Sequence, residues 1–284
     1  LELVDAGKKV IVTGCLAQKH PEELKKEVPE VAAIVGATDF TKIIEVLKEM
    51  ENGYVCEVSE KPDYVYPEEV ERQQITMGAS SYIKIADGCN YRCGYCIIPY
   101  LRGDYHSRKM EVIIEEAKKL VKRGVTEIIL IAQDTTGYGI DLYKKPMLSE
   151  LLEELNKIEG LGWIRVMYAY PTQMTDELLD TIARLDKVVK YVDIPLQHSH
   201  PEMLKMMNRP AFDYRPMIEN IRKRIPNVSI RTAFIVGYPG ETEEQFEHLC
   251  EFVRDMKFDR MGVFTYSREK GTPSYNMPNR VPAR

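Results

Sequence analysis

A regular alternation of short apolar runs with longer amphipathic segments constrains the fold of this chain more than any other feature of its sequence. Candidate β-strands are the runs Ser81–Ala86, Glu127–Ala132, Trp163–Tyr168, Tyr191–Ile194, Ile230–Val236 and Met261–Tyr266. Apolar periodicity between these runs predicts helices at Glu111–Arg123, Leu148–Ile158, Thr175–Leu185, Tyr214–Arg224 and Glu243–Met256. Strands that alternate with helices favour parallel βα units with right-handed crossovers. The sequence therefore predicts an α/β protein whose strands form an open or partly closed barrel.

The predicted strands show little alternation of apolar and polar residues, which is typical of strands buried on both faces. In barrels of this kind, active-site residues lie at the carboxyl ends of the strands and in the loops that follow them. We therefore expect functional side chains at those ends.

The first part of the chain has a shorter strand–helix pattern. It predicts a strand at Lys9–Val12 and helices at Pro21–Glu27 and Thr41–Met50. The next segment is acidic, contains Pro62 and Pro67 and has no clear period, which favours a linker with at most a short edge strand. We predict the C-terminal part of a small α/β domain at 1–50, a linker at 51–80, the barrel at 81–270 and an exit segment at 271–284. Because the chain begins without Met and stops in a Pro-rich stretch, we interpret it as a fragment of a longer protein.

The composition is that of a globular protein. The chain has 284 residues, of which 44% are hydrophobic and 29% charged. It has no apolar run long enough to cross a membrane and no signal-peptide pattern at its start, so we expect no membrane association and a cytoplasmic location. The net charge of −5 leaves no overall basic excess to neutralise nucleic-acid phosphates.

Three of the six cysteines are clustered. Cys89, Cys93 and Cys96 have the spacing C-x₃-C-x₂-C and follow the first predicted barrel strand. Gly88 and Gly94 allow the backbone to curl so that the thiolates converge. Cysteine thiolates are the usual ligands of iron–sulfur clusters. Three of them would bind three irons and leave a fourth iron open to a substrate or cofactor.

Other interpretations of these cysteines remain open. A structural zinc site requires four closed ligands, and His106 is available as the fourth, which would make the chain a zinc-stabilised binding module. The spacing argues against this, because zinc sites usually combine C-x₂-C with a second ligand pair. A disulfide would leave an odd thiol and does not suit a cytoplasmic protein. Three inert buried cysteines are the remaining possibility.

The cysteine loop resembles that of the radical S-adenosylmethionine (SAM) superfamily. That superfamily has a C-x₃-C-x₂-C loop after the first strand of a (βα)₆ partial TIM-like barrel, with an aromatic residue before the last cysteine, here Tyr95. The resemblance implies a 4Fe–4S cluster whose open iron binds the amino and carboxylate groups of SAM. Reduction of the cluster then cleaves SAM and yields a 5′-deoxyadenosyl radical.

Further segments resemble the methylthiotransferase family within this superfamily. They are 87–108, 131–139, 234–242 and 266–273. Tyr170–Thr172 and Asp193–His198 are similar to the branch that adds a methylthio group to the β-carbon of an aspartate in ribosomal protein S12 of the small subunit. The branch that modifies a tRNA adenosine is the alternative. The resemblance also implies a second 4Fe–4S cluster for sulfur insertion, with Cys15 as its third ligand and the other two upstream of Leu1.

The resemblance assigns further site residues. It implies contacts with SAM from Tyr95, Gln133, Asp134, Asp193, Gln197, Ile235, Gly237 and Tyr266. It also suggests contacts with the substrate, including its carboxylate, from Arg102, Arg108 and His198. The implied cofactors are SAM and two clusters in the full-length protein, one of them fully liganded here, and the implied partners are S12, an electron donor and a sulfur source.

Several of these residues have structural alternatives. Gln133 and Asp134 suit a turn, Asp193 suits a buried ion pair, and His198 suits a structural histidine. Cys56 and Cys250 fit no ligand spacing, so we expect them to be structural. The turn at Gly237–Gly240 lacks the Gly-Lys-Ser/Thr of a phosphate-binding loop, which argues against ATP binding.

Overall fold

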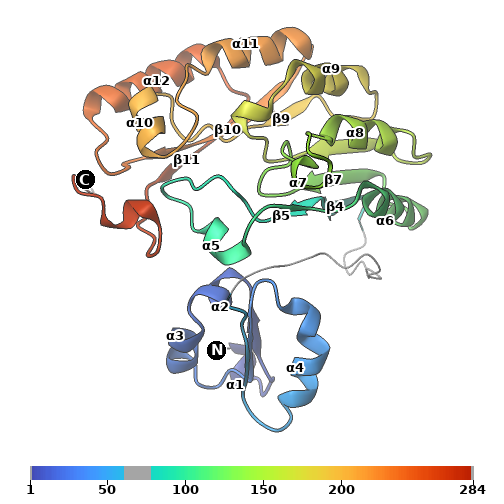
Figure 1. Cartoon of the computed structure of the whole chain (residues 1–284), viewed down its shortest axis with the longest axis vertical. Helices are drawn as coiled ribbons and strands as arrows, with labels where there is room; N and C mark the ends of the chain where they lie inside the picture. Colours follow the sequence, from blue (N-terminus) through green and yellow to red (C-terminus); the bar gives the residue numbers. More distant parts are fainter. Residues whose placement is uncertain (1, 61–77, 283–284) are drawn as a thin grey trace. The chain divides into compact units, whose positions relative to one another are not determined.

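The computed structural model describes residues 2–60 and 78–282, and these divide into two compact units. The N-terminal unit comprises 2–60 together with Gly88–Asn90 and Ile97–Asp104. The barrel unit comprises 78–87, Tyr91–Cys96 and 105–282. Figure 1 colours both along the chain. The prolines that suggested a linker, Pro62 and Pro67, lie outside the described residues.

The N-terminal unit contains a parallel three-stranded sheet in the order β1-β2-β3. Its strands are β1 (Ile11–Thr13), β2 (Ala33–Val35) and β3 (Val55–Glu57), and its helices are α1 (Glu2–Asp5), α2 (Cys15–Lys19), α3 (Pro21–Glu27), α4 (Ile43–Glu49) and α5 (Ile98–Arg102), with a 3₁₀ turn η1 (Phe40–Lys42). Ile34 packs on one face of the sheet with Ala17 and Val31. Val35 packs on the other face with Val46 of α4. Helices therefore cover both faces of a small sheet whose edge strand β3 lies in the segment interpreted as a linker.

The barrel unit contains the alternating elements that the sequence predicts. Its strands are β4 (Ser80–Lys84), β5 (Ala86–Asp87), β6 (His106–Ser107), β7 (Glu127–Ile131), β8 (Trp163–Val166), β9 (Tyr191–Asp193), β10 (Ser229–Val236) and β11 (Arg260–Thr265). Its helices are α6 (Met110–Lys122), α7 (Ile140–Tyr143), α8 (Leu148–Asn156), α9 (Asp176–Arg184), α10 (Pro201–Met206), α11 (Arg215–Arg224) and α12 (Glu243–Met256), with 3₁₀ turns η2 (Pro171–Gln173) and η3 (Pro273–Asn276). The short helices α5, α7 and α10 are not predicted by the sequence.

Local sequence explains where two of these helices begin. The Thr175 hydroxyl accepts the backbone N–H of Leu178 and caps α9, as predicted. Thr242 and Gln245 form a reciprocal capping box at the start of α12.

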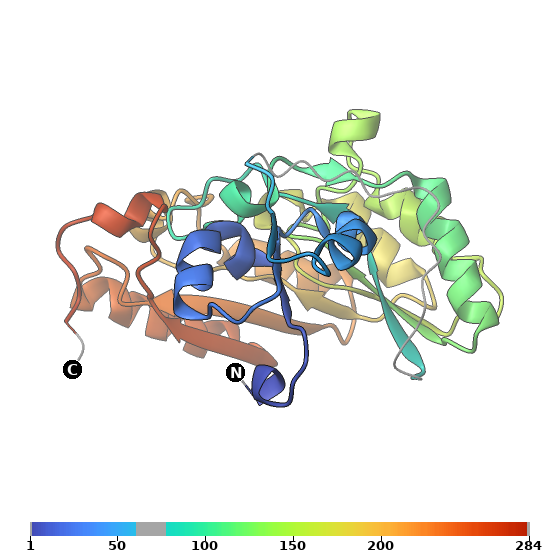
Figure 2. The ribbon, with the colours of Figure 1, turned by 90° about the horizontal axis from the view of Figure 1, so that it is seen from below.

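The main strands of the barrel unit run parallel in one series. They pair in the orders β4-β7-β8 and β9-β10-β11. A parallel bridge between Ile164 and Val188 joins the two sheets next to β8 and β9. Figure 2 shows β10 and β11, coloured orange to red, side by side. Within the described residues β4 and β11 do not pair with each other, so the series of six parallel strands forms a partial barrel that stays open between them.

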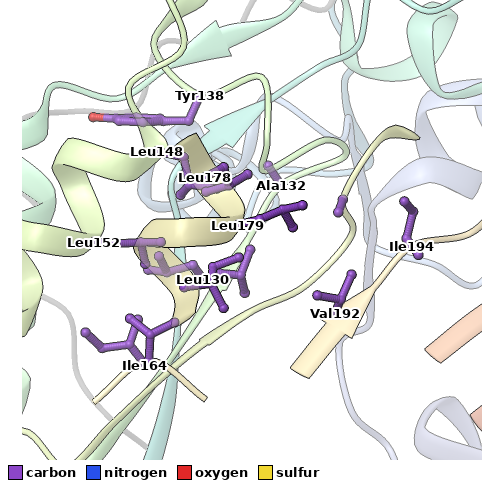
Figure 3. Packing of buried hydrophobic residues seen from close by; sticks show 14 of the residues in the cluster. Leu130, Ala132, Tyr138, Leu148, Leu152, Ile164, Leu178, Leu179, Val192 and Ile194 are labelled. Atoms are coloured by element: carbon purple, nitrogen blue, oxygen red, sulfur yellow. The ribbon is translucent and has the colours of Figure 1, made fainter. Parts of the chain in front are cut away.

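The strands β4, β7 and β8 alternate in burial, which corrects the expectation that both of their faces are buried. In β7, Ile128 and Leu130 are fully buried, whereas Glu127 is only partly buried. The buried set packs against the helices: Figure 3 shows Leu130 and Ile164 close to Leu152 and Leu179. Because the helices cover only one side of the strands (Figure 1), the other side is an inner face, which in β7 carries Glu127, Ile129 and Ile131. No helix of the described residues is long and apolar enough to span a membrane.

Candidate functional site

The cysteine loop follows β5, the short strand that continues from β4. Within the described residues none of the three cysteines forms a disulfide; Cys93 is buried, and Cys89 and Cys96 are half-buried. No group of three His, Cys, Asp or Glu residues in the described parts of the chain has the geometry to hold a single metal ion. A cubane cluster makes a different demand, because each of its thiolates binds a different iron.

Two glycines of this loop are required by their surroundings. Gly88 has φ +77°, and a Cβ there would lie 2.0 Å from the Asp104 carbonyl oxygen. A Cβ on Gly94 would lie 2.5 Å from the Tyr238 hydroxyl and 3.3 Å from the Met206 carbonyl oxygen. The expectation that glycine is needed at these two positions agrees with the structure.

The loop between Cys93 and Cys96 is held by backbone hydrogen bonds on both sides. The Gly94 N–H donates to the Met207 carbonyl at 2.8 Å, and the Gly94 carbonyl accepts from the Ser274 N–H at 2.9 Å. The Asn208 side-chain amide donates to the Arg92 carbonyl at 2.8 Å. The end of α10 and the start of η3 therefore hold this loop in place.

We predict that Gly94→Ala lowers the iron bound after anaerobic reconstitution, because the new methyl group displaces the loop from Tyr238. Adding Tyr238→Phe removes the 2.5 Å contact and should restore part of the iron content. Gly78→Ala is the matched control, since a Cβ at Gly78 meets nothing within 4 Å. Iron and sulfide analysis measures the effect. Wild-type iron content in Gly94→Ala would show that the loop tolerates the displacement.

Three of the residues that the resemblance assigns to SAM meet in one apolar cluster. Tyr95, Ile235 and Tyr266 pack against the buried residues Met203, Met207 and Tyr238. The Tyr238 and Tyr266 rings meet edge to face with centroids 5.2 Å apart. Through Tyr95, this apolar cluster packs against the cysteine loop.

Asp134 and Gln133 differ in what surrounds them. The Asp134 carboxylate accepts the backbone N–H and the hydroxyl of Thr136, at 2.9 Å and 2.5 Å. Burial raises the pKa of Asp134, although these hydrogen bonds act in the opposite direction. The side-chain carbonyl oxygen of Gln133 is buried with no hydrogen-bond partner in the described residues. Asp134 therefore shapes the turn, whereas Gln133 offers an acceptor to a ligand.

Asp193 forms a buried ion pair. Its side chain is inaccessible to solvent and accepts from Arg231 Nη1 at 2.7 Å. The hydrogen bond with Asp193 raises the pKa of the Arg231 guanidinium. Gln197, at φ +73°, donates its N–H to the Ala233 carbonyl at 2.8 Å and continues the pairing with β10. These contacts favour the ion-pair interpretation of Asp193.

His198 lies between β9 and α10 and has no exposed surface. Its Nδ1 accepts the His200 backbone N–H at 3.0 Å, so its Nε2 carries the proton that is shared with Glu241 at 2.9 Å. The other oxygen of Glu241 accepts the Gly237 N–H. With both ring nitrogens engaged, His198 holds Glu241 against the Gly237 turn, which favours the structural alternative for this histidine.

The two arginines assigned to the substrate also have structural partners. Arg108 is buried, pairs with Glu116 at 2.7 Å and donates to the Lys84 carbonyl at 2.7 Å. Arg102, in the N-terminal unit, donates from Nη2 to the Cys15 sulfur at 3.8 Å. Cys15 opens α2 after Gly14, which has φ +101°. Arg102 therefore contacts Cys15, whereas the hydrogen bonds of Arg108 go to Glu116 and Lys84 within the barrel unit.

Sequence reasoning missed Arg209. This arginine is only 9% exposed, and no carboxylate pairs with it in the described residues. Its Nη2 donates to the Pro195 carbonyl at 2.6 Å, its guanidinium lies 4.5 Å from the Tyr170 ring centroid, and its Nε has no partner. Burial alone lowers the pKa of Arg209, but the nearby Tyr95 and Cys93 raise it and dominate. The signal in the sequence was a single arginine two residues after the segment 203–207, in which every residue except Lys205 is apolar.

Comparisons with known proteins agree with this geometry. The family model of the radical SAM superfamily matches residues 83–253. The chain is 50% identical over 285 residues to the ribosomal protein uS12 methylthiotransferase RimO of Acaryochloris marina, covering 99% of this chain and 64% of that protein. It is 52% identical over 277 residues to the protein of the same name from Thermoanaerobacter sp. strain X514, covering 96% of this chain and 63% of that protein. The chain thus spans somewhat less than two thirds of these curated relatives.

Solved structures share the fold at low sequence identity. The radical SAM methyltransferase TsrM from Kitasatospora setae, solved with cobalamin and a [4Fe-4S] cluster bound, has a TM-score of 0.57 at 19% identity and covers 68% of this chain and 38% of its own. The cobalamin-dependent SAM radical enzyme OxsB has a TM-score of 0.60 at 12% identity, with 96% and 42% covered. The fold, the clamped cysteine loop and the family match lead to one conclusion: this chain belongs to the radical SAM superfamily.

Proposed function

We propose that this chain is the radical-generating part of a methylthiotransferase that modifies ribosomal protein uS12. The observation that carries the proposal is the near-complete match, at 49–52% identity, to proteins of that name. The clamped cysteine loop, the buried Arg209 and the unpartnered side-chain oxygen of Gln133 support it, because a cluster and SAM need thiolates, a cation and an acceptor.

The residues present fit both cofactors. Cys89, Cys93 and Cys96 would bind three irons of a 4Fe–4S cluster and leave the fourth open. The buried Arg209 guanidinium would hold the SAM carboxylate, and the unpartnered Gln133 oxygen would accept from its amino group. When reduced, the bound cluster supplies the electron that cleaves SAM to a 5′-deoxyadenosyl radical.

The roles of the protein's own residues follow from their contacts. Tyr95, Ile235 and Tyr266 exclude water from one side of the cofactor site. Asp134, Asp193 and Gln197 shape the strand ends, and Gly237 is held by Glu241 and His198. Cys15 would be one ligand of the second, sulfur-inserting cluster, with Arg102 stabilising its thiolate.

The remaining parts of the proposal concern partners. The substrate would be uS12, modified on the β-carbon of an aspartate as a post-translational modification in the cytoplasm. The reaction would also require an electron donor and a source of sulfur. Modification of a tRNA adenosine is the competing outcome.

The deciding experiment is mass spectrometry of uS12 after incubation with the reconstituted whole protein, SAM, a strong reductant and sulfide. We expect one methylthio group on one aspartate. A parallel reaction with tRNA is the control. Modification of the tRNA without modification of uS12 would identify tRNA as the substrate in place of uS12. One bound zinc without SAM cleavage would contradict the enzyme class.

A further inference from the structure

Tyr168, in the loop after β8, has an unusual backbone conformation. Its φ is +61°, in the left-handed region that residues with a bulky side chain rarely adopt. Its side chain is 43% exposed, whereas the next residue, Ala169, is buried. An uncommon conformation that does not serve core packing calls for another explanation.

Hydrogen bonds from two neighbouring strand ends hold this conformation. The Tyr168 N–H donates to Asp193 Oδ2 at 3.3 Å, at the end of β9. The Tyr168 carbonyl accepts the Thr135 N–H at 3.1 Å, after β7. Asp193 is itself fixed by Arg231 and by the Ala169 N–H, which donates to its backbone carbonyl at 2.8 Å. The peptide groups on both sides of Tyr168 are therefore tied down, so the strain persists in the folded protein.

Tyr168 lies at the carboxyl end of β8, next to Thr135 after β7 and Asp193 at the end of β9. It is close enough to Tyr191 and Arg231 to influence the pKa of each. Within the described residues, no hydrogen bond engages its hydroxyl. The backbone of Tyr168 is thus held in place, and its exposed side chain is open to a ligand.

The charges around the ring indicate the class of ligand. Arg231 pairs with Asp193, and Arg165 pairs with Glu127 at 2.8 Å. Each of these two cations is matched by one carboxylate, so the two pairs add no net positive charge to attract a phosphate backbone. Tyrosine provides an apolar ring and a polar hydroxyl, which suit a polypeptide segment that carries both kinds of group.

We propose that Tyr168 contacts the polypeptide substrate and that the Asp193–Arg231 ion pair holds Tyr168 in position. The inference rests on the proposed function, because it assigns a substrate contact to the same site. Asp193 thereby acts through Tyr168 as a positioning residue.

The test compares Tyr168→Gly and Tyr168→Phe with Lys144→Gly. Lys144 also has φ +61° but lies after α7, so its replacement relieves the same strain outside the proposed contact. Each variant of the reconstituted whole protein is assayed for its melting temperature, its KM for uS12, and the ratio of 5′-deoxyadenosine released to uS12 modified.

Both glycine variants should melt at the wild-type temperature or up to about 4 °C higher, because glycine adopts this conformation without strain. Only Tyr168→Gly should raise the KM for uS12, roughly tenfold for the loss of one buried aromatic contact. It should also raise the ratio of 5′-deoxyadenosine to product. Tyr168→Phe, which keeps the ring, should show a smaller rise in KM.

Two contrary outcomes are distinguishable. Wild-type protein that modifies uS12, together with a Tyr168→Gly variant of unchanged KM or lower melting temperature, would overturn this inference alone. Wild-type protein that leaves uS12 unmodified would overturn the proposed function and this inference with it.

Discussion

Cys93→Ala is expected to remove about four irons and four sulfides per chain from the reconstituted protein and to abolish SAM cleavage. Cys93 is 7% exposed and lies in the loop that Met207, Asn208 and Ser274 hold in place. Loss of one thiolate leaves two in a segment that presents three, and two are too few to retain a cubane with one open iron. Iron and sulfide analysis, the electron paramagnetic resonance of the reduced protein and release of 5′-deoxyadenosine measure the result.

Cys250→Ala and Cys56→Ala are the matched controls for this prediction. Cys250 is half-buried within α12, and Cys56 is exposed in β3. Both variants should retain wild-type iron and SAM cleavage. A Cys93→Ala variant that still cleaves SAM, or a wild-type protein that binds one zinc in place of iron, would contradict the assignment of the loop.

The strand–helix alternation could be predicted because it depends on local periodicity. The expected strands at Glu127–Ala132 and Ile230–Val236 differ from β7 and β10 by one residue at one end, and α12 begins and ends where predicted. The short helices were missed because one or two turns carry too little apolar period to be recognised. The burial pattern was misread since sequence does not show that helices cover only one face of these strands.

The candidate site was predictable where its signal is a spacing of residues. Cys89, Cys93 and Cys96 are adjacent in the sequence, so their common role is visible without a structure. The roles of Arg108 and His198 depend on partners, Glu116 and Glu241, whose proximity only the tertiary structure reveals. Tyr168 was missed for a similar reason, because nothing local to a tyrosine signals a positive φ.

Arg209→Met is expected to weaken SAM binding by at least about 30-fold, which corresponds to about 2 kcal/mol. The guanidinium is buried against Tyr170 and has no paired carboxylate within the described residues. A buried cation without an anion is unfavourable, so the natural occupant of this position carries a negative charge. The carboxylate of SAM is the anion that the proposed reaction requires there.

The same substitution should leave the protein without cofactors as stable as the wild type, or more stable. Methionine fills a similar volume without the cost of burying a charge, and replacements of this kind are often neutral or stabilising. Equilibrium dialysis of SAM and urea unfolding of the cofactor-free protein measure the two effects. Arg224→Met is the control for binding, because Arg224 pairs with Asp180 on the outer helices at 2.7 Å.

The opposite signs of the two effects separate a binding role for Arg209 from a structural one. If Arg209 mainly joins Pro195 to Tyr170, its replacement should lower the free energy of unfolding and change SAM affinity little. If Arg209 instead binds the SAM carboxylate, its replacement should leave the free energy of unfolding unchanged or higher and should lower the affinity for SAM. Arg209→Lys refines the distinction. Lysine keeps the positive charge but lacks the planar group that stacks on Tyr170 and donates two parallel hydrogen bonds. The affinity of this variant for SAM should therefore lie between those of the wild type and Arg209→Met.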